Sequence, residues 1–235
     1  MTKKETLVLL PGLLCDERLW QHQVAYFKQN YHIIIPDFSA HDTIENMVKS
    51  VIDQVKENQF YLAGLSMGGY VALEMLQLYP DRIKKLALLN TSARKDDVKM
   101  NRRRRALIAQ VKGIGTFRGI TNRLLKLLID KTQLENEQLV ELIKTMTQDI
   151  GKAIYLKHQH AILNRKSHLK ILKDSHVSIL CITGENDHII SMSETIEMAD
   201  IIAQDKAIII KNCGHLSALE QPEQINKYLE DFFRI

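Results

Sequence analysis

The residues whose types and spacing could do chemistry begin with a serine between glycines, in the run Gly64-Leu65-Ser66-Met67-Gly68-Gly69. An apolar run typical of a strand, 60–63, precedes it, and residues 70–79 follow with the apolar spacing of a helix. A G-x-S-x-G pattern between a strand and a helix is typical of a sharp turn that presents the serine beyond the end of a sheet. Glycine at 64 and 68 leaves room for the reversal. We therefore predict that Ser66 is a nucleophile.

A serine hydroxyl needs a neighbouring base, and the base needs a third group that fixes its tautomer and balances its charge. Asp187 follows the strand-like run 177–182, and His215 follows the run 207–210. Because the carboxyl ends of parallel strands meet at one edge of a sheet, both residues are expected beside Ser66. The sequence therefore predicts Asp187 as the acid and His215 as the base.

Other acids compete for the same role. Asp96 and Asp97 come after the strand-like run 83–89, and Glu185 lies close to Asp187. A single aspartate after a strand is also a common turn residue, and a single histidine is commonly a surface or core residue. The assignment therefore depends on three residues falling on three strand ends together.

The elements that must position these residues alternate along the chain. Strand-like apolar runs occupy 6–10, 31–35, 60–63, 83–89, 177–182 and 207–210. Helices are expected between or after them at 16–30, 42–57, 70–79, 191–203 and 222–233. Asp42 or Thr43 would cap the second helix, and Ser191 with Glu194 has the pattern of a capping box. This alternation predicts a parallel sheet with helices on both faces.

Between residues 94 and 165 the alternation stops and only helical periodicity remains. We expect helices around 101–111, 117–129, 135–147 and 152–163, interrupted at Gly113, Gly115 and Gly151. The predicted organisation is thus a core formed by 1–93 and 166–235, with a helical cap formed by 94–165.

Five motifs are distributed along the chain: Leu10-Pro11-Gly12-Leu13, Gly64-Leu65-Ser66-Met67-Gly68-Gly69, Gly184-Glu185-Asn186-Asp187, Gly214-His215 and Glu220-Gln221-Pro222. Through these motifs the chain resembles the α/β-hydrolases, in particular the capped esterases and the esterases of pimeloyl-carrier-protein methyl ester. The motifs span nearly the whole chain, and the order Ser, Asp, His is the order of that family. The resemblance implies an α/β-hydrolase fold with about six mostly parallel strands.

The resemblance also implies an activity, namely hydrolysis of a carboxylic ester or thioester through a Ser-His-Asp triad and an acyl-enzyme. The backbone amides of Leu13 and Met67 would form the oxyanion hole, with Leu14 as the alternative to Leu13. No metal and no other cofactor is implied. A lactone, a C–C bond or a peptide remains open as the substrate, because such hydrolases share one triad.

The front of the predicted cap is basic, with twelve lysines and arginines but three acidic residues between 94 and 131. A solvated helix face is one interpretation. The other is a docking surface for an anionic acyl carrier, an acyl carrier protein or a coenzyme A ester, with Arg102, Arg103 and Arg105 as contacts. Aromatic residues are not interleaved with these arginines, so nucleic acid is not expected as a partner.

Composition indicates an ordinary globular protein: 235 residues, 45% hydrophobic, 26% charged, with a net charge of +4. No apolar run approaches the roughly 20 residues of a membrane span, and the start of the chain does not resemble a signal peptide, so we expect a cytoplasmic protein without a membrane partner. Cys15, Cys181 and Cys213 are expected to be reduced. His158 and His160 diverge on a helix and do not predict a metal site. A non-catalytic ligand-binding protein of the same fold is the alternative from another class.

Overall fold

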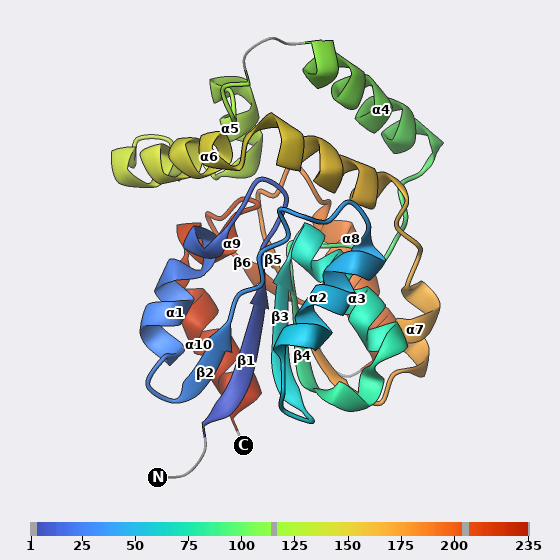
Figure 1. The fold of residues 1–235 in the computed structure, drawn as a ribbon. Coiled ribbons are helices and arrows are strands. Elements are labelled where there is room, and N and C mark those ends of the chain that lie inside the picture. The colour runs from blue at the N-terminus through green and yellow to red at the C-terminus, as the bar shows by residue number, and fades with distance from the viewer. Residues whose placement is uncertain (1–3, 114–116, 204–206, 235) are drawn as a thin grey trace.

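The computed structural model describes residues 4–113, 117–203 and 207–234. Six parallel strands form one sheet in the order β2-β1-β3-β4-β5-β6 (Figure 1). Their bounds are β1 Glu5–Leu10, β2 Tyr31–Ile34, β3 Phe60–Leu65, β4 Ile83–Leu89, β5 Ser178–Gly184 and β6 Ile208–Ile210. The predicted parallel sheet of about six strands is therefore confirmed.

Helices cover both faces of the sheet, as the alternation predicted. One face packs on α2 (Ile44–Gln54), α3 (Met67–Leu78), α7 (Leu169–Asp174) and α8 (Met192–Ile202). The other packs on η1 (Glu17–Trp20), α1 (Gln21–Phe27), α9 (Ser217–Glu220) and α10 (Pro222–Phe233). A short turn of helix, η2 (Pro80–Arg82), leads into β4.

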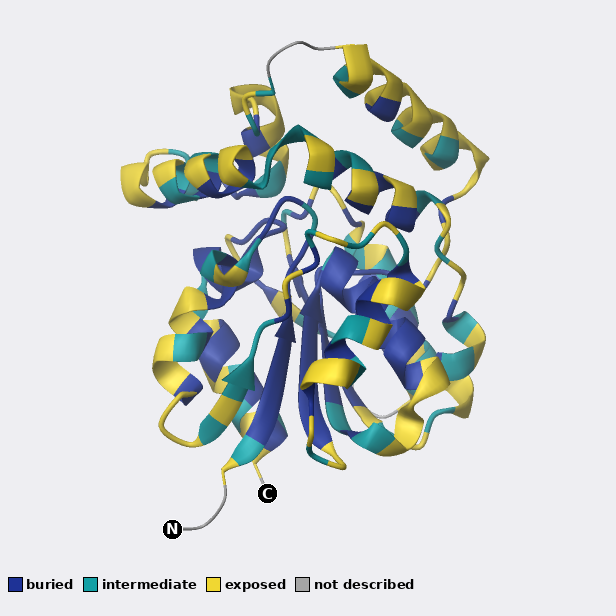
Figure 2. Ribbon diagram, viewed as in Figure 1, coloured by how far each residue is buried: buried dark blue, intermediate teal, exposed yellow. Residues whose placement is uncertain are grey.

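The continuous apolar runs follow from this double cover. In β1, Val8 and Leu10 belong to the hydrophobic cluster of the α2 and α3 face, whereas Leu7 and Leu9 belong to the cluster of the α1 and α10 face. All four are fully buried, and the central strands are dark blue in Figure 2. A strand buried on both sides needs apolar residues at every position, so it does not alternate.

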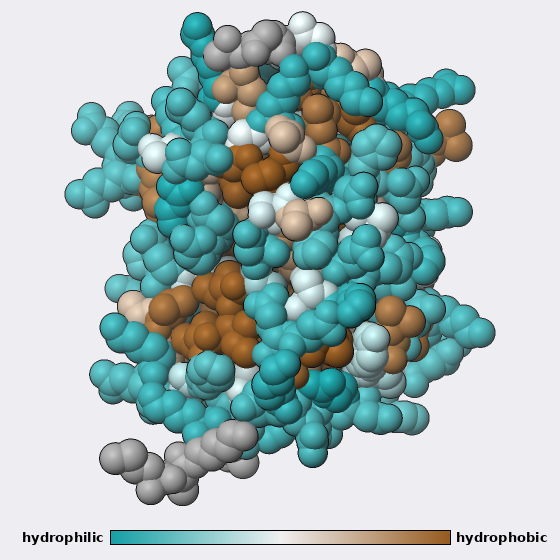
Figure 3. Space-filling model, in the orientation of Figure 1, coloured by the Kyte–Doolittle hydropathy of each residue, from teal (hydrophilic) through white to brown (hydrophobic). Residues whose placement is uncertain are grey.

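The cap consists of α4 (Val98–Gly113), α5 (Asn122–Leu128), η3 (Lys131–Gln133) and α6 (Glu137–Leu163). It lies over the carboxyl ends of the strands, opposite the two chain termini (Figure 1). On the face shown in Figure 3, hydrophobic side chains emerge among hydrophilic ones on both the core and the cap. The cap therefore covers the edge where Ser66, Asp187 and His215 were expected.

Several predicted elements differ in detail. Strand β2 is an edge strand with half-exposed residues, so the apolar run 31–35 does not mark a strand that is buried on both faces. The expected helix 16–30 starts as the 3₁₀ turn η1, which Asp16 caps, and Thr43 rather than Asp42 caps α2. The two expected helices 135–147 and 152–163 lie within α6 and meet at Gly151, whose φ of 73° and ψ of 176° are not helical, so the predicted interruption at Gly151 is confirmed.

Short helices are where the sequence was least informative. Helices α7 and α9 have only six and four residues, too short to show a period. At α8, the Ser191 side chain accepts from the N–H of Ser193 rather than from that of Glu194, so the cap is simpler than the expected capping box. The predicted break at Gly115 falls outside the described residues.

Candidate active site

Ser66 occupies the sharp turn between β3 and α3. Its φ is 55° and its ψ is −115°, a conformation that non-glycine residues rarely adopt, and its N–H donates to the carbonyl of Leu89 at 3.0 Å. Gly64 and Gly68 are needed on either side of Ser66 because a Cβ at either position would overlap backbone atoms. A Cβ on Gly64 would lie 2.4 Å from the Gly68 oxygen, and one on Gly68 would lie 2.2 Å from the Leu10 oxygen. The turn therefore holds Ser66 in a strained conformation at the end of the sheet.

Asp187 and His215 meet as the sequence predicted. Asp187 follows β5 and His215 follows β6, and Oδ2 of Asp187 lies 2.8 Å from Nδ1 of His215. Both side chains are buried. Burial would raise the pKa of Asp187, but the charge and hydrogen bond of His215, with hydrogen bonds from Asn90 and the Ile190 amide, hold this pKa below its usual value. The carboxylate therefore stays ionised and fixes the imidazole with Nδ1 as the donor.

Asn90, at the end of β4, is a positioning residue that the sequence analysis missed. Its Nδ2 donates to Oδ2 of Asp187 at 3.0 Å and to the Gly214 carbonyl at 3.1 Å. Ser217 Oγ lies 2.6 Å from Asn90 Oδ1 and fixes which way the amide points. Asn90 thus connects the acid to the loop before His215. The only signal in the sequence was its place after a strand, which is not specific.

The loop after β1 lies directly against Ser66. Gly12, Leu13, Leu14 and Cys15 form a turn in which the Cys15 N–H donates to the Gly12 carbonyl at 3.2 Å and Leu14 has φ 61°. A Cβ on Gly12 would lie 3.4 Å from Cβ of Ser66. The loop that carries Leu13 thus flanks the serine on one side.

Met67 follows Ser66 directly as the first residue of α3. Amides at the start of a helix have no partner within the helix, and they carry its positive end. The Ser66 carbonyl is held by Thr91 Oγ1 at 2.8 Å, so the start of α3 is fixed by the end of β4.

Glu220 connects the His215 loop to the cap. Its Oε2 accepts from the amides of Asp130 at 2.7 Å and Gly214 at 2.9 Å, and its Oε1 accepts from the amide of Leu216 at 3.0 Å. Burial raises its pKa to about 7, although these amides and the nearby His215 oppose the shift. The sequence placed Glu220 in a motif without indicating this role.

The cap also contacts the His215 loop through the backbone. The N–H of His215 donates to the Leu128 carbonyl at 2.8 Å, and that of Leu216 donates to the same carbonyl at 3.3 Å. Asn186, next to Asp187, donates to Oδ2 of Asp130 at 2.7 Å. A hollow of about 430 Å³ lies beside this contact, lined by Lys126, Ile129, Asp130, Lys131, Leu134, Asn186 and His188.

The competing acids lie elsewhere. Asp96 is buried, with ion pairs to Arg104 at 2.7 Å and Arg165 at 2.8 Å, and the two arginines hold its pKa low against the effect of burial. Asp97 caps the start of α4 through the Met100 amide, and Glu185 is exposed. None of these contacts involves His215: Asp96 and Asp97 bind neighbours of their own, and Glu185 faces solvent.

The four consecutive arginines of α4 divide into two groups. Arg104 is half-buried and pairs with Asp96, whereas Arg102, Arg103 and Arg105 are exposed. This division follows from the helix, since successive residues turn by about 100°. The residues predicted as contacts for an anionic partner are therefore those that face solvent.

Two further features concern other kinds of site. Among the described residues, no group of three histidine, cysteine or acidic side chains could hold a metal ion, and His158 is buried while His160 is exposed. No helix within the described ranges is long and apolar enough to cross a membrane. Cys15, Cys181 and Cys213 are free and buried.

Comparison with known proteins identifies the family. Residues 5–222 match the family described as alpha/beta hydrolase fold. The chain is 24% identical to monoacylglycerol lipase ABHD6 of Bos taurus over 265 residues, covering 97% of this chain and 75% of that protein. A thermophilic esterase from Thermogutta terrifontis superposes with a TM-score of 0.88 at 24% identity, over 99% of this chain and 90% of that one. The enol-lactonase from Burkholderia xenovorans LB400 superposes with a TM-score of 0.85 at 22% identity, over 98% of this chain and 91% of that one. The chain therefore belongs to the α/β hydrolase fold family, and its relatives support a hydrolase activity.

Proposed function

We propose that the protein is a serine hydrolase that cleaves a carboxylic ester or thioester through Ser66, His215 and Asp187. The observation that carries the proposal is the buried hydrogen bond between Asp187 and His215, which follow β5 and β6 at the same edge of the sheet as the strained turn at Ser66 after β3. The relatives include a lipase, an esterase and a lactonase, whose names favour an ester or lactone, and also 2-hydroxy-6-oxononadienedioate hydrolases, which keep a C–C bond as the alternative.

The chemistry follows from the tautomer of His215. Because Nδ1 donates to Asp187, Nε2 carries the free lone pair and accepts the proton of Ser66 as Oγ attacks the acyl carbonyl. The amides of Leu13 and Met67 stabilise the resulting oxyanion, and the positive end of α3 adds to their effect. His215 then gives its proton to the leaving oxygen or sulfur, which leaves the acyl group on Ser66. A water that His215 deprotonates releases the acid and restores the serine.

The test is a panel of p-nitrophenyl esters of increasing chain length, with a fluorophosphonate as a probe of the nucleophile. We expect hydrolysis by the wild type, labelling on Ser66, and loss of activity by several orders of magnitude in Ser66→Ala without loss of fold. Labelling on another residue would contradict the assignment of Ser66. A folded protein that binds the esters without hydrolysing any of them would favour the non-catalytic alternative.

A second candidate concerns the carrier of the acyl group, an acyl carrier protein or coenzyme A. It is favoured by the exposed Arg102, Arg103 and Arg105, which leave positive charge on the outer side of the cap. Attraction between such a surface and an anionic carrier is screened by salt. No nucleic acid and no membrane is proposed as a partner.

This candidate is tested by replacing Arg102, Arg103 and Arg105 together by serine. The apparent KM for an acyl-carrier or coenzyme A ester should rise, less so at high salt, while a small neutral ester is unaffected. A matched control removes three exposed lysines from core helices, Lys49, Lys170 and Lys227. If the two triple variants change the apparent KM equally, or if neither changes it, the arginines of the cap do not bind the carrier.

A further inference from the structure

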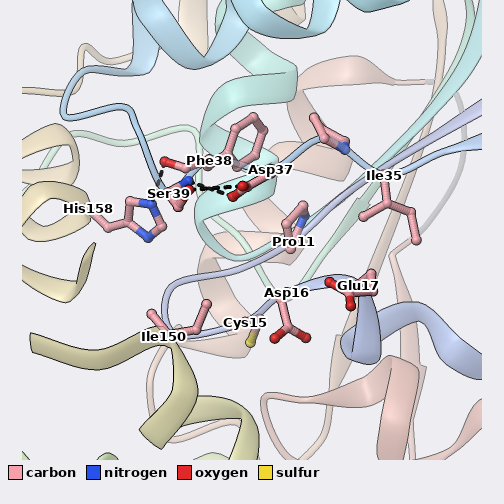
Figure 4. Close-up of a pocket in the computed structure, with 11 residues that line it drawn as sticks. Pro11, Cys15, Asp16, Glu17, Ile35, Asp37, Phe38, Ser39, Ile150 and His158 are labelled. Atoms are coloured by element: carbon pink, nitrogen blue, oxygen red, sulfur yellow. Dashed lines mark hydrogen bonds between the residues drawn. The ribbon is translucent and has the colours of Figure 1, made fainter. Parts of the chain in front are cut away.

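A cavity of about 60 Å³ lies one strand away from Ser66, at the same edge of the sheet. Its walls come from the loop after β1, the loop after β2 and the cap helix α6, with His158 and Ile150 on the cap side (Figure 4). The loop after β1 is shared with the candidate active site, since Gly12 lies beside Ser66 while Pro11 and Cys15 line the cavity. A volume of this size admits a hydroxymethyl or ammonium group.

His158 is the unusual member of this lining. It is 2% exposed, and its Nε2 lies 3.0 Å from the carbonyl oxygen of Phe38. A carbonyl only accepts, so Nε2 carries the hydrogen and Nδ1 carries a lone pair. No described residue donates to Nδ1, although the atom is buried. Burial also lowers the pKa of His158, which keeps the ring neutral.

An acceptor that is buried without a donor is unfavourable, and structures rarely keep one without a reason. The rest of the lining does not supply the donor. Asp37 accepts from the N–H and the hydroxyl of Ser39 at 2.8 and 2.9 Å, and Asp16 is paired with Arg18. Glu17 adds a third carboxylate. The walls thus present hydrogen-bond acceptors and negative charge, which suits a donor and disfavours a carboxylate.

We propose that this cavity is a substrate subsite for a hydrogen-bond donor, a hydroxyl or ammonium group, which donates to Nδ1 of His158. The proposal rests on the hydrolase function proposed above and makes His158 a residue that determines specificity. The substrate class is then an ester that carries a hydroxyl or amine, in its alcohol or its acyl part, rather than a second carboxylate.

The experiment compares esters that differ in one polar group. Glyceryl monobutyrate is paired with 2-methylbutyl butyrate, which has methyl groups in place of the hydroxyls. In the acyl part, p-nitrophenyl 6-hydroxyhexanoate and 6-aminohexanoate are paired with p-nitrophenyl heptanoate. We expect the wild type to prefer the donor-bearing member of at least one pair by roughly tenfold or more in kcat/KM, because the methyl analogue leaves Nδ1 unpaired. The pair that shows the preference also identifies the part of the substrate, and hydroxyl or ammonium, that the cavity takes.

Three variants connect the preference to His158. His158→Phe removes the acceptor and should abolish the preference while the methyl analogue is still hydrolysed. His158→Gln keeps both a donor for Phe38 and an acceptor, so it should retain part of the preference if the phenylalanine variant fails to fold. His160→Leu is the matched control, because His160 is an exposed histidine on the same helix, and it should leave the preference unchanged.

Two outcomes would overturn the proposal: equal rates for the members of every pair in the wild type, as expected if the cavity holds only water, or a preference that persists in His158→Phe. The esters are also titrated into Ser66→Ala by calorimetry. Selective binding without hydrolysis by the wild type would contradict the proposed function and support the subsite, whereas hydrolysis without selectivity would contradict the subsite alone.

Discussion

Replacing Asp187 by asparagine keeps the shape of the side chain but puts an NH₂ group among hydrogen-bond donors. Oδ2 accepts from Nδ1 of His215 and Nδ2 of Asn90. Oδ1 accepts from the N–H groups of Ile189 at 2.8 Å and Ile190 at 3.0 Å. An asparagine must place its NH₂ group at one of these two positions, so either orientation brings donors face to face.

The two orientations have different consequences for the reaction. With the NH₂ group at the Oδ1 position, it meets two backbone donors that cannot turn away. With the NH₂ group at the Oδ2 position, His215 changes tautomer so that Nδ1 accepts, and Nε2 then carries a hydrogen and cannot take the proton of Ser66. The second is less costly because the imidazole can give up its Nδ1 hydrogen, so that only Nδ2 of Asn90 still faces a donor, and this Nδ2 keeps the Gly214 carbonyl as a partner. The expected loss in kcat is about 10³- to 10⁴-fold, the loss that the wrong tautomer causes in the Ser-His-Asp proteases, or about 4 to 5.5 kcal/mol of barrier.

The assay is kcat with p-nitrophenyl acetate, with urea unfolding to show that the variant is folded. Asp96→Asn is the matched control, because Asp96 is also buried and follows the neighbouring strand but pairs with Arg104 and Arg165. It should lose stability and keep its activity within a few-fold. A folded Asp187→Asn variant within tenfold of the wild type, or a larger loss in Asp96→Asn, would refute the reasoning.

Four further substitutions test other parts of the structure. Asn90→Ala removes a donor to the buried carboxylate of Asp187, so kcat/KM should fall about 10- to 100-fold; a change below twofold would contradict its positioning role. Gly68→Ala puts a Cβ 2.2 Å from the Leu10 oxygen and should lower the free energy of unfolding by roughly 3 kcal/mol or more, whereas Gly113→Ala, with nothing within 4 Å, should not. The pKa of Glu220 is raised from 4.5 to about 7, so its protonated form is favoured in the folded state, and its contribution to stability is fully present below about pH 4.5 and lost as the pH rises to about 7. The free energy of unfolding of wild type minus that of Glu220→Gln should therefore fall by about 3 kcal/mol over this range, and a pH-independent difference would be evidence against it. Arg104→Ser leaves the buried Asp96 with one arginine and should lower the melting temperature of the protein, while Arg103→Ser leaves it unchanged; equal melting temperatures would show that the ion pair adds nothing.

The sequence by itself determined the sheet and the identities of the candidate catalytic residues. Runs such as 7–10 have apolar residues at every position because they are buried on both faces, so parallel strands can be recognised without a structure. Ser66, Asp187 and His215 could be found because each follows an apolar run typical of a strand, and the carboxyl ends of the strands lie at one edge of a parallel sheet. The expected cap also follows from a simple local signal, the change from strand runs to helical periodicity.

Only the tertiary structure decided how these residues are held. Asn90, Asp187 and Ser217 are far apart in the sequence, and their contacts depend on which strands are neighbours in the sheet. Glu220 acquires its role because the cap brings the Asp130 amide to it, and the lone pair on His158 becomes significant only when α6 closes a cavity over the loops. Hydrogen bonds between distant segments leave no periodic trace in a sequence, because each needs one suitable atom at one place in space rather than a residue type repeated along the chain.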